Sequence, residues 1–435
     1  MLRVNPQQYG LLINTISCNP GLLRVIVICM GALTLYVTPC FTWGSTPDAH
    51  DPKPNFKWEF IKAARLPGAT VAHSATVLQN GDVLVLGGYG KLFGRLPMAA
   101  TLARIYEPKN NTWRVLKSSL HTGRLEHAAL GLPDGRVLIV GGRGQNSLPL
   151  YSIEIFDPNS EQFQPIASLR YRRTRPRLNL LDDYRVLITG HNRRPEIFQP
   201  DPNSPTGFTS RLLKQSSRNS HSNHNALNLP DGSILLAAGG YGAFERFHPD
   251  SETFSLCRAR FRNAIDDQAS ATLYNGKILL AGGQEIGLMG SINGSWLYDP
   301  QIDQLQSGPT LTVKLQNKPT CEPVFLNGVS DLQAIDLFDR DPRRRGRYIF
   351  LCGGEYDSGK NGQQDIVLDC AWLYDAVRNR MIDVGPMLYP HDEFALASLP
   401  APEGQAKVLI IGGHGADDSF QSHCEIFSFQ LVEME

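Results

Sequence analysis

A segment of about fifty residues that recurs along the chain constrains its fold more than any other feature of the sequence. The clearest copies read HSATVLQNGDVLVLGG at 73–88 and HAALGLPDGRVLIVGG at 127–142. Every copy contains two apolar runs, and the second run ends in glycine. The last glycines of the copies are Gly88, Gly142, Gly190, Gly240, Gly283, Gly354 and Gly413. Seven copies predict an array of small similar units rather than two or three unrelated domains.

Each copy predicts four short strands. Pairs such as Asn80-Gly81 and Asp134-Gly135 separate the first two runs, and such pairs suit a tight hairpin turn. The second run, VLVL at 83–86 for example, is apolar at successive residues, which is typical of a strand buried on both faces. A third run ends in an acidic residue and proline, as in SIEIFDP at 152–158. A large apolar residue such as Trp113 then marks a fourth strand.

The two ends of this array predict a closed ring. The seventh copy stops at 429–435 without a fourth strand, whereas an unassigned segment, FKWEFIKAARLPG at 56–68, precedes the first copy. If this segment supplies the missing strand, with Trp58 in the aromatic position, it closes the circle and removes the exposed sheet edges. We therefore expect an all-β, seven-bladed β-propeller over residues 56–435, with four antiparallel strands per blade.

These motifs resemble the kelch repeat, which combines a glycine pair after an apolar strand, an acidic residue before proline, and a later aromatic residue. The form PDG-x-[VI]-L-x-x-GG is also similar to the repeats of the galactose oxidase propeller. The resemblance covers 56–435 and implies the propeller fold, but kelch-like propellers include enzymes, ligand binders and docking platforms. Two copies depart from the pattern. The third has Thr189-Gly190 for the glycine pair, and the sixth carries a charged insertion at about 331–347.

An uncharged N-terminal segment predicts export. Residues 25–44 contain no charged side chain, Arg24 precedes them and Asp48 follows. The most apolar part, 25–37, has the length of a signal-peptide core, whereas the whole run is just long enough to span a bilayer. We expect residues 1–44 to be a signal peptide or a signal anchor, and 45–55 to be a linker. The propeller would then lie in the periplasm, in the cell envelope or outside the cell, with or without a membrane anchor.

The net charge bears on the class of partner, and the number of cysteines bears on disulfide pairing. The 42 basic and 42 acidic residues give no net charge, which argues against a nucleic-acid partner. Export would place the cysteines in an oxidising compartment. The cysteines beyond the leader are Cys257, Cys321, Cys352, Cys370 and Cys424. Because their number is odd, at least one stays unpaired within the chain. A Cys352–Cys370 disulfide is one possible pairing.

The alternation of antiparallel strands predicts where ligand-binding side chains gather. The loop that enters the first strand of a blade and the loop that leaves the second lie at the same edge, so they open together on one face around the axial channel. The candidate ligand-binding residues on this face are His73, His127, Arg143, Arg175, His191, His224, Asp267, Gln284, Glu322, Glu355, His391 and His414. Glu322 and His391 are the first candidates for acid–base catalysis. Each histidine has the alternative role of a structural hydrogen-bonding group.

Charge is distributed unevenly around this face. The run RYRRTRPR at 170–177 makes the sector of blades three and four cationic. The sector of blades five and six is anionic, through Asp266, Asp267, Glu285 and Glu322. This asymmetry could orient a polar ligand such as an acidic sugar. Alternatively, the arginines and aspartates pair with each other across the channel mouth.

Two functions remain open. The first is a non-catalytic, monomeric propeller that binds a protein or a glycan at the channel mouth and needs no cofactor, since no familiar catalytic motif occurs. The second is an exported carbohydrate-active enzyme that resembles the sialic acid mutarotases or, as a further alternative, galactose oxidase. The galactose oxidase family holds copper through tyrosine and histidine at the mouth. The nearest match here is Tyr389-Pro390-His391, in which a proline intervenes.

Overall fold

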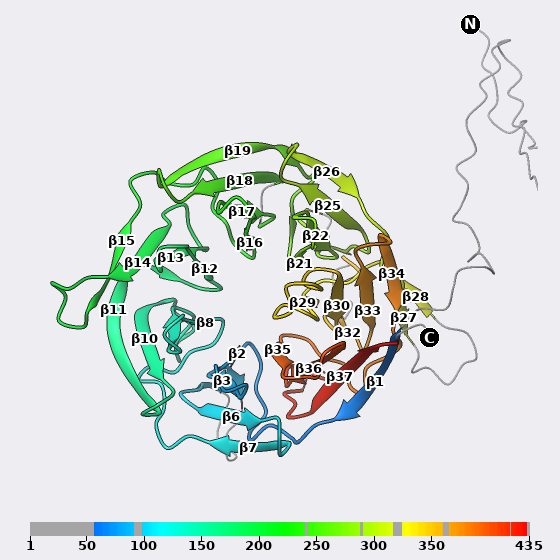
Figure 1. Cartoon of the computed structure of the whole chain (residues 1–435), viewed down its shortest axis with the longest axis horizontal. Coiled ribbons are helices and arrows are strands. Elements are labelled where there is room, and N and C mark those ends of the chain that lie inside the picture. The colour runs from blue at the N-terminus through cyan, green and yellow to red at the C-terminus, as the bar shows by residue number, and fades with distance from the viewer. Residues whose placement is uncertain are drawn as a thin grey trace, which may run out of the picture. The chain divides into compact units, whose positions relative to one another are not determined.

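The computed structural model describes residues 56–90, 98–239, 242–287, 290–315, 324–359, 365–417 and 419–432. All of them belong to one unit, Pro54–Glu435. Within these ranges the chain forms seven four-stranded antiparallel sheets, which Figure 1 shows as blades around a central axis. The predicted all-β propeller is therefore confirmed.

The first four blades follow the repeats directly, and their strands run from the axis outward. Blade one consists of β2 (Ser74–Val77), β3 (Val83–Leu86), β6 (Ala103–Glu107) and β7 (Thr112–Val115). Blade two consists of β8 (Ala128–Gly131), β9 (Val137–Val140), β10 (Leu150–Asp157) and β11 (Gln162–Arg173). Blade three consists of β12 (Arg177–Leu180), β13 (Val186–Thr189), β14 (Glu196–Pro200) and β15 (Phe208–Leu212). Blade four consists of β16 (Asn225–Asn228), β17 (Ile234–Ala237), β18 (Ala243–His248) and β19 (Thr253–Arg260).

The last three blades follow in the same order, and blade seven takes its outer strand from the N-terminal segment. Blade five consists of β21 (Ala269–Thr272), β22 (Ile278–Ala281), β25 (Ser295–Asp299) and β26 (Gln304–Ser307). Blade six consists of β29 (Gln333–Asp336), β30 (Tyr348–Cys352), β33 (Ala371–Asp375) and β34 (Arg380–Asp383). Blade seven consists of β35 (Ala395–Leu399), β36 (Gln405–Ile411), β37 (Cys424–Leu431) and β1 (Phe56–Lys62). The small extra strands are β4 (Tyr89–Gly90), β5 (Met98–Ala99), β20 (Ile265–Asp266), β23 (Gln284–Glu285), β24 (Gly290–Ser291), β27 (Val313–Leu315), β28 (Val324–Leu326), β31 (Glu355–Tyr356) and β32 (Ile366–Val367).

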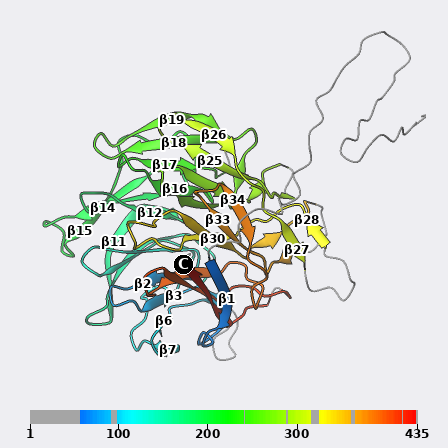
Figure 2. The ribbon, with the colours of Figure 1, turned by 45° about the vertical axis from the view of Figure 1, so that its right-hand side comes forward.

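The N-terminal strand closes the ring as expected. β1 pairs antiparallel with β37, from Phe56 opposite Leu431 to Lys62 opposite Glu425. Trp58 occupies the expected aromatic position, and its Nε1 donates to the carbonyl oxygen of Val384 at 2.7 Å. Figure 2 shows β1 lying along the outer edge of the last blade. The two ends of the described chain therefore form one sheet.

The second strand of each blade forms the core, because it is apolar on both faces and packs against the neighbouring blade. Leu84 and Leu86 of blade one lie in one buried cluster with Ile139 and Phe156 of blade two. The next residues explain the recurring glycines. A Cβ on Gly88 would lie 2.1 Å from Thr70 Oγ1, and Gly88 also has a φ of +93°. A larger residue would therefore clash and strain the backbone at this position.

One backbone hydrogen bond joins each blade to the next around the whole circle. The amide that follows the second strand by two residues donates to a carbonyl oxygen of the segment that leads into the next blade, at 2.8–3.0 Å. The donor–acceptor pairs are Gly88–Arg124, Gly142–Arg173, His191–His221, Gly239–Ile265, Gly283–Val329, Gly354–His391 and Gly413–Thr70. Two expectations about the glycine pair are therefore wrong by one residue. In the third copy the pair is Gly190-His191 rather than Thr189-Gly190. In the fourth copy the pair is Ala238-Gly239 and ends one residue before Gly240.

Two further expectations need comment. The charged insertion of the sixth blade is a loop at 337–347 between β29 and β30, so it opens on the face opposite the mouth. The possible Cys352–Cys370 disulfide is absent, since both thiols are free. Cys352 packs with the blade-seven side of its sheet and Cys370 with the blade-five side, so the two side chains lie in different clusters.

No helix in the described ranges could span a membrane, and residues 25–44 lie outside those ranges.

Candidate functional site

One residue in each blade, two positions before the inner strand, adopts the left-handed conformation. These residues form what we call the axial ring: Ala72, Glu126, Arg175, Asn223, Asp267, Asp331 and Glu393. Their φ angles lie between 45° and 55°. Such angles are uncommon for residues other than glycine, so their repetition marks a position fixed by the fold. Backbone hydrogen bonds also join ring neighbours, as from Glu126 N to Ala72 O and from Arg175 N to Glu126 O, both at 2.9 Å.

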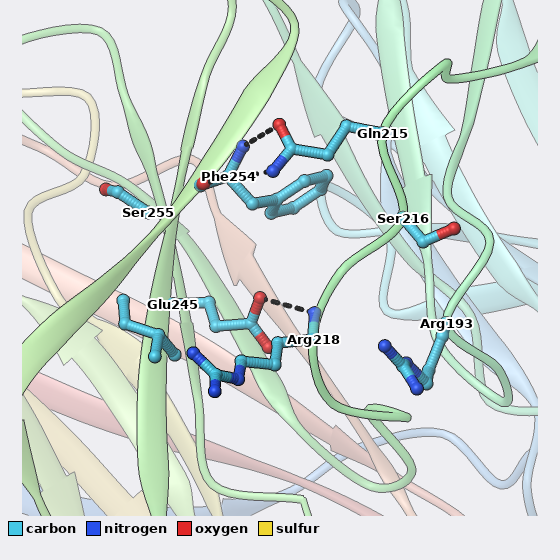
Figure 3. Close-up of a pocket in the computed structure, with 8 residues that line it drawn as sticks. Arg193, Gln215, Ser216, Arg218, Glu245, Phe254 and Ser255 are labelled. Atoms are coloured by element: carbon cyan, nitrogen blue, oxygen red, sulfur yellow. Dashed lines mark hydrogen bonds between the residues drawn. The ribbon is translucent and has the colours of Figure 1, made fainter.

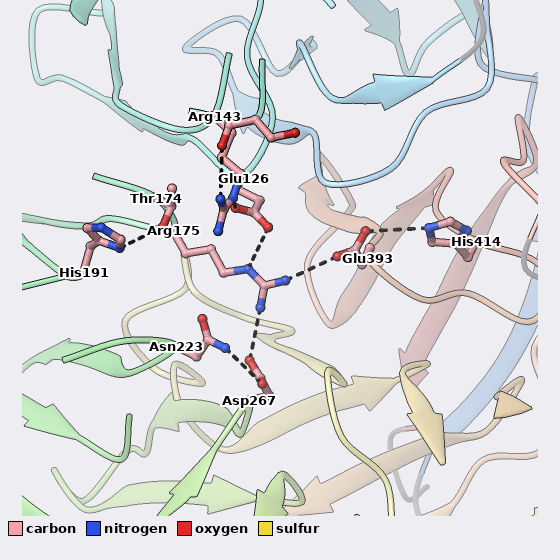
Figure 4. Close-up of polar contacts among 10 residues, drawn as sticks. Glu126, Arg143, Thr174, Arg175, His191, Asn223, Asp267, Glu393 and His414 are labelled. Atoms are coloured by element: carbon pink, nitrogen blue, oxygen red, sulfur yellow. Dashed lines mark hydrogen bonds and ion pairs between the residues drawn. The ribbon is translucent and has the colours of Figure 1, made fainter. Parts of the chain in front are cut away.

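The Arg175 side chain reaches across the channel mouth and contacts three carboxylates. Its Nε lies 3.3 Å from Glu126 Oε1, its Nη1 3.4 Å from Asp267 Oδ1, and its Nη2 3.3 Å from Glu393 Oε1. Figure 4 shows the guanidinium group between these side chains from blades two, five and seven. Burial alone would lower the pKa of Arg175, but the surrounding carboxylates raise it above its ordinary value. At Arg175, therefore, the charged sectors pair across the mouth.

The three carboxylates also have partners farther from the axis. Arg143 Nε lies 2.5 Å from Glu126, and Asn223 Nδ2 donates to Asp267 at 3.1 Å. His414 Nε2 lies 3.7 Å from Glu393. These contacts fix the carboxylates in place, so the mouth presents one extended polar network (Figure 4).

A second group of carboxyl groups in the sector of blades five to seven binds protons unusually tightly. The pKa of Asp392 rises to about 7 and that of Glu355 to about 8, first because both are largely buried and then because other carboxylates are near. The same causes raise the pKa of Asp266 to about 6. Asp392 Oδ1 is buried without a hydrogen-bond partner among the described residues. Near neutral pH, this sector therefore contains carboxyl groups that can both donate and accept protons.

The raised pKa of Asp392 predicts a pH-dependent effect of the substitution Asp392→Asn. Because the folded-state pKa, about 7, exceeds the ordinary value of 3.8, the folded chain binds more protons than the unfolded chain between these pH values. The contribution of Asp392 to stability therefore falls as pH rises to 7. An asparagine has no proton to lose, so the variant should exceed the wild type in free energy of unfolding by about 2–4 kcal/mol at pH 8.

Thermal melting at pH 5 and pH 8 measures this effect. The gain in melting temperature should shrink at pH 5, where Asp392 is already protonated in the folded state. Asp250→Asn, at an exposed turn, serves as the control and should change little at either pH. An equal gain from Asp392→Asn at both pH values would contradict the assigned protonation state.

Three of the candidate histidines lie between blades rather than in the mouth. His73, His127 and His224 are buried one residue after the axial ring. His127 Nε2 lies 2.8 Å from the Ser74 hydroxyl, and His224 Nε2 2.8 Å from the Thr189 hydroxyl, in each case on the preceding blade. Burial, and next the charge of Arg104, lowers the pKa of His73 to about 3. Burial also lowers the pKa values of His127 and His224 well below the ordinary value, so these two rings join neighbouring blades as neutral groups.

His391, the histidine of the candidate acid–base pair, is fully buried. Its Nδ1 lies 2.6 Å from Gly412 O, and its Nε2 3.1 Å from Glu425 Oε1. Arg124, Arg173 and His221 occupy the same position on the segments that lead into blades two, three and four, and they pair with Glu154, Glu196 and Glu245. His391 thus belongs to a repeated buried pair. Glu322 lies outside the described residues.

The remaining candidates lie at the predicted edge. Isolated bridges pair Leu125 with Arg143, Ser330 with Glu355, and Asp392 with His414, so the two loops of these blades do open together. His191 Nδ1 lies 3.1 Å from the Thr174 hydroxyl, and Gln284 donates to Asp357 at 2.8 Å. Glu126, Asn223, Asp331 and Glu393 of the axial ring were missing from the candidate list. In the sequence, each of these residues lies two positions before the first strand of its copy, and this constant spacing could have identified them.

The described residues do not fit the copper site that the galactose oxidase resemblance implies. His73, His127 and His224 lie between different pairs of blades, and the ring of Tyr389 stacks on His423 at 4.1 Å. Among the residues that the structure describes, no three His, Cys, Asp or Glu side chains form a group that could hold a metal ion.

Comparisons with known proteins agree with the fold. The Kelch motif matches residues 125–170. An N-acetylneuraminate epimerase of Salmonella arizonae is 31% identical over 99 residues, which are 22% of this chain and 25% of the relative. The tRNA wybutosine-synthesizing protein 4 of Saccharomyces cerevisiae is 33% identical over 112 residues, which are 24% of this chain and 15% of the relative. The chain thus spans a quarter or less of the length of these curated relatives.

A solved structure extends the comparison to most of the chain. A fungal alcohol oxidase of the AA5 family, in complex with copper, superimposes with a TM-score of 0.61 and 14% sequence identity, over 86% of this chain and 76% of the oxidase. At this identity the likeness concerns the fold alone. The repeats, the seven sheets and the matched motif together show that the chain folds as a β-propeller and contains a Kelch motif at 125–170.

Proposed function

We propose that this protein is an exported binding propeller that takes a glycan at its channel mouth, either secreted or held in the envelope by residues 25–44. The observation that carries the proposal is the axial ring. Six of its seven side chains are polar or charged, and they gather around Arg175 on one face. Converging polar groups of this kind are characteristic of small-ligand sites.

The chemistry of the ring favours a glycan over a protein partner. Protein-docking surfaces rely on aromatic and other large apolar anchors, and the axial ring contains none. Carboxylate, amide and guanidinium groups instead match the alternating donors and acceptors of sugar hydroxyls. An apolar contact is also near, since the Tyr89 and Phe420 rings lie 5.7 Å apart at the edge of the mouth. Such rings can support the C–H face of a sugar.

The ion pairs of Arg175 are suited to exchange with a ligand. Its side chain is about a third exposed, at 34%, and its three contacts are all 3.3 Å or longer. Partly exposed pairs of this kind contribute about 1 kcal/mol or less each. A sugar could therefore replace one of them at low cost while the remaining two keep the side chain in position.

A glycan panel tests the proposal on the full chain. We expect at least one neutral or acidic glycan to raise the melting temperature, because a ligand that binds only the folded state stabilises it. Glu393→Gln should weaken that binding about tenfold or more, since it removes a carboxylate that would accept hydrogen bonds from sugar hydroxyls. Glu403→Gln, at an exposed position outside the mouth, is the matched control. Absence of any shift across the panel, or equal loss in both variants, would reject glycan binding at the mouth.

A carbohydrate-active enzyme resembling the sialic acid mutarotases is the second candidate. It is favoured by the 31% identity to an N-acetylneuraminate epimerase over 99 residues and by the raised pKa values of Asp392 and Glu355. Proton transfer to and from a sugar is most efficient when the catalytic pKa lies near the working pH. Exchange between the anomers of N-acetylneuraminate, followed by NMR, separates the candidates. An enzyme should lose this activity in Asp392→Asn while ligand binding persists.

A further inference from the structure

The connections between second and third strands around the channel mouth are long on one side and short on the other. On the side with long connections, these form small hairpins, β4–β5, β23–β24 and β31–β32, and a bridge joins His414 to Phe420. Neighbouring connections also contact each other, through the Gly290–Ser358 bridge and the Tyr89–Phe420 rings. In blades three and four the same connections are only residues 190–195 and 238–242, too short for such hairpins.

A pocket of about 430 Å³ lies between these two blades. Figure 3 shows it between the short connection of blade three, the segment that leads into blade four, and the outer strand β19. Its lining residues are Arg193, Gln215, Ser216, Arg218, Glu245, Phe254, Ser255 and Leu256. Because it lies outside the axial ring, it is a separate site from the mouth network.

The pocket carries an excess of positive charge. Neither Arg193 nor Arg218 forms an ion pair with a carboxylate among the described residues, in contrast to Arg143 and Arg175. Glu245, which also lines the pocket, is 1% exposed. Its carboxylate already accepts the backbone N–H groups of Arg218 and Asn219 at 2.8 Å and lies 3.2 Å from His221 Nε2. Its hydrogen bonds therefore hold this backbone segment and His221, and it forms no ion pair with Arg193 or Arg218 among the described residues.

Two features fix the shape of the pocket. Arg193 Nε donates to Ser217 O at 3.1 Å, so this guanidinium is anchored through one nitrogen. The Gln215 side chain is bound at both ends by the backbone of Phe254, since its Oε1 accepts from Phe254 N at 3.0 Å and its Nε2 donates to Phe254 O at 3.4 Å. Sites that are held rigid in advance lose less entropy when a ligand binds.

Apolar and hydroxyl groups complete the lining. The Phe254 side chain is half-buried, and Leu256 is 47% exposed. The hydroxyl-bearing residues Ser216 and Ser255 lie beside them. A ligand that suits this combination has a carboxylate for the arginines, a C–H face for the apolar side chains and hydroxyl groups for the serines. A sugar acid has all three.

We propose that this pocket binds the carboxylate-bearing unit of an acidic saccharide through Arg193 and Arg218. Arginine suits this role because its planar guanidinium matches the geometry of a carboxylate and forms strong charge-assisted hydrogen bonds. The short connections of blades three and four leave room for the rest of the saccharide chain. This site does not depend on glycan binding at the mouth.

Saturation-transfer NMR with galacturonate and galactose tests the proposal on the full chain, because the two sugars differ only in the carboxylate. Galacturonate should give a signal that is at least ten times stronger than that of galactose. The double variant Arg193→Ala/Arg218→Ala should lower the galacturonate affinity at least tenfold. The matched double variant Arg340→Ala/Arg345→Ala, in the exposed loop of blade six, removes the same charge and should keep the affinity.

Three results would overturn the proposal. These are equal signals for the two sugars, equal losses in the two double variants, and displacement of galacturonate by inorganic phosphate at the same concentration, which would make the pocket a general anion site. Glu393→Gln separates this site from the mouth, because it should leave galacturonate binding to the pocket unchanged. Melting temperatures of both double variants within about 2 °C of the wild type would show that folding is intact.

Discussion

A chain that lacks residues 56–62 is expected to lose most of its resistance to unfolding and to aggregate. β1 supplies the outer strand of blade seven, and its aromatic side chains pack on β37, with ring centroids 5.1 Å apart for Phe56–Phe429 and 5.2 Å for Phe60–Phe427. Removing a single buried aromatic side chain costs about 3–5 kcal/mol. Phe56 is buried and Phe60 is partly buried, so the loss of both rings together with the strand pairing is of the order of the whole stability of a typical protein, about 5–15 kcal/mol.

Size-exclusion chromatography and thermal melting of the deletion variant measure this effect. The deletion exposes the edge of β37, and unpaired edges promote association between chains. A deletion of equal length upstream of residue 56 is the control and should leave the melting curve unchanged. A monomeric variant that melts like the control would show that the ring does not need its N-terminal strand.

The substitution Glu196→Leu is expected to lower the free energy of unfolding by about 3–5 kcal/mol, the range for breaking a buried ion pair. Glu196 and Arg173 are both fully buried, with Arg173 Nη2 2.9 Å from Glu196 Oε1. The same carboxylate accepts the backbone N–H groups of Arg170 and Tyr171 and the hydroxyl of Ser210. Leucine would leave the guanidinium without its counter-ion and two amides without an acceptor.

Glu161→Leu provides the matched control for this prediction. Its partner Arg114 and Glu161 itself are about 40% exposed, at 39% and 40%, so its loss should cost less than about 1 kcal/mol. Urea denaturation gives both values. Restoring part of the stability with the double variant Arg173→Leu/Glu196→Leu would support the charge explanation. A cost for Glu196→Leu no larger than that of the control would refute it.

The propeller could be predicted because its signals are local and recur. Turns such as Asn80-Gly81 depend only on neighbouring residues, and the buried run at 83–86 has the same form in blade after blade. The closure by 56–62 could be predicted because the seventh copy lacked one strand. Where one copy differs from the others, the exact position of its glycine pair could not be predicted. The one-residue errors at His191 and Gly239 arose where a copy replaces or shifts its glycine pair.

The mouth was predicted less well, for a geometric reason. The left-handed residue of the axial ring directs its side chain into the mouth, whereas the next residue directs its side chain between blades. Glu126 and His127 are adjacent in sequence, yet only Glu126 contacts Arg175. A difference of one residue decides between a ligand contact and a buried blade-to-blade contact. The direction of each side chain depends on the positive φ of the axial-ring residue, which the neighbouring histidine in the sequence does not indicate.

The position of Arg175 has a consequence for any molecule that enters the channel. Blades two, five and seven already share one internal counter-ion through Glu126, Asp267 and Glu393. An incoming ligand must therefore compete with a side chain that is tethered at the same point and is always present. Such built-in competition disfavours solutes that make a single weak contact and favours molecules that offer several hydroxyl groups to the network. Selectivity at the opening would then be set by valency more than by charge alone.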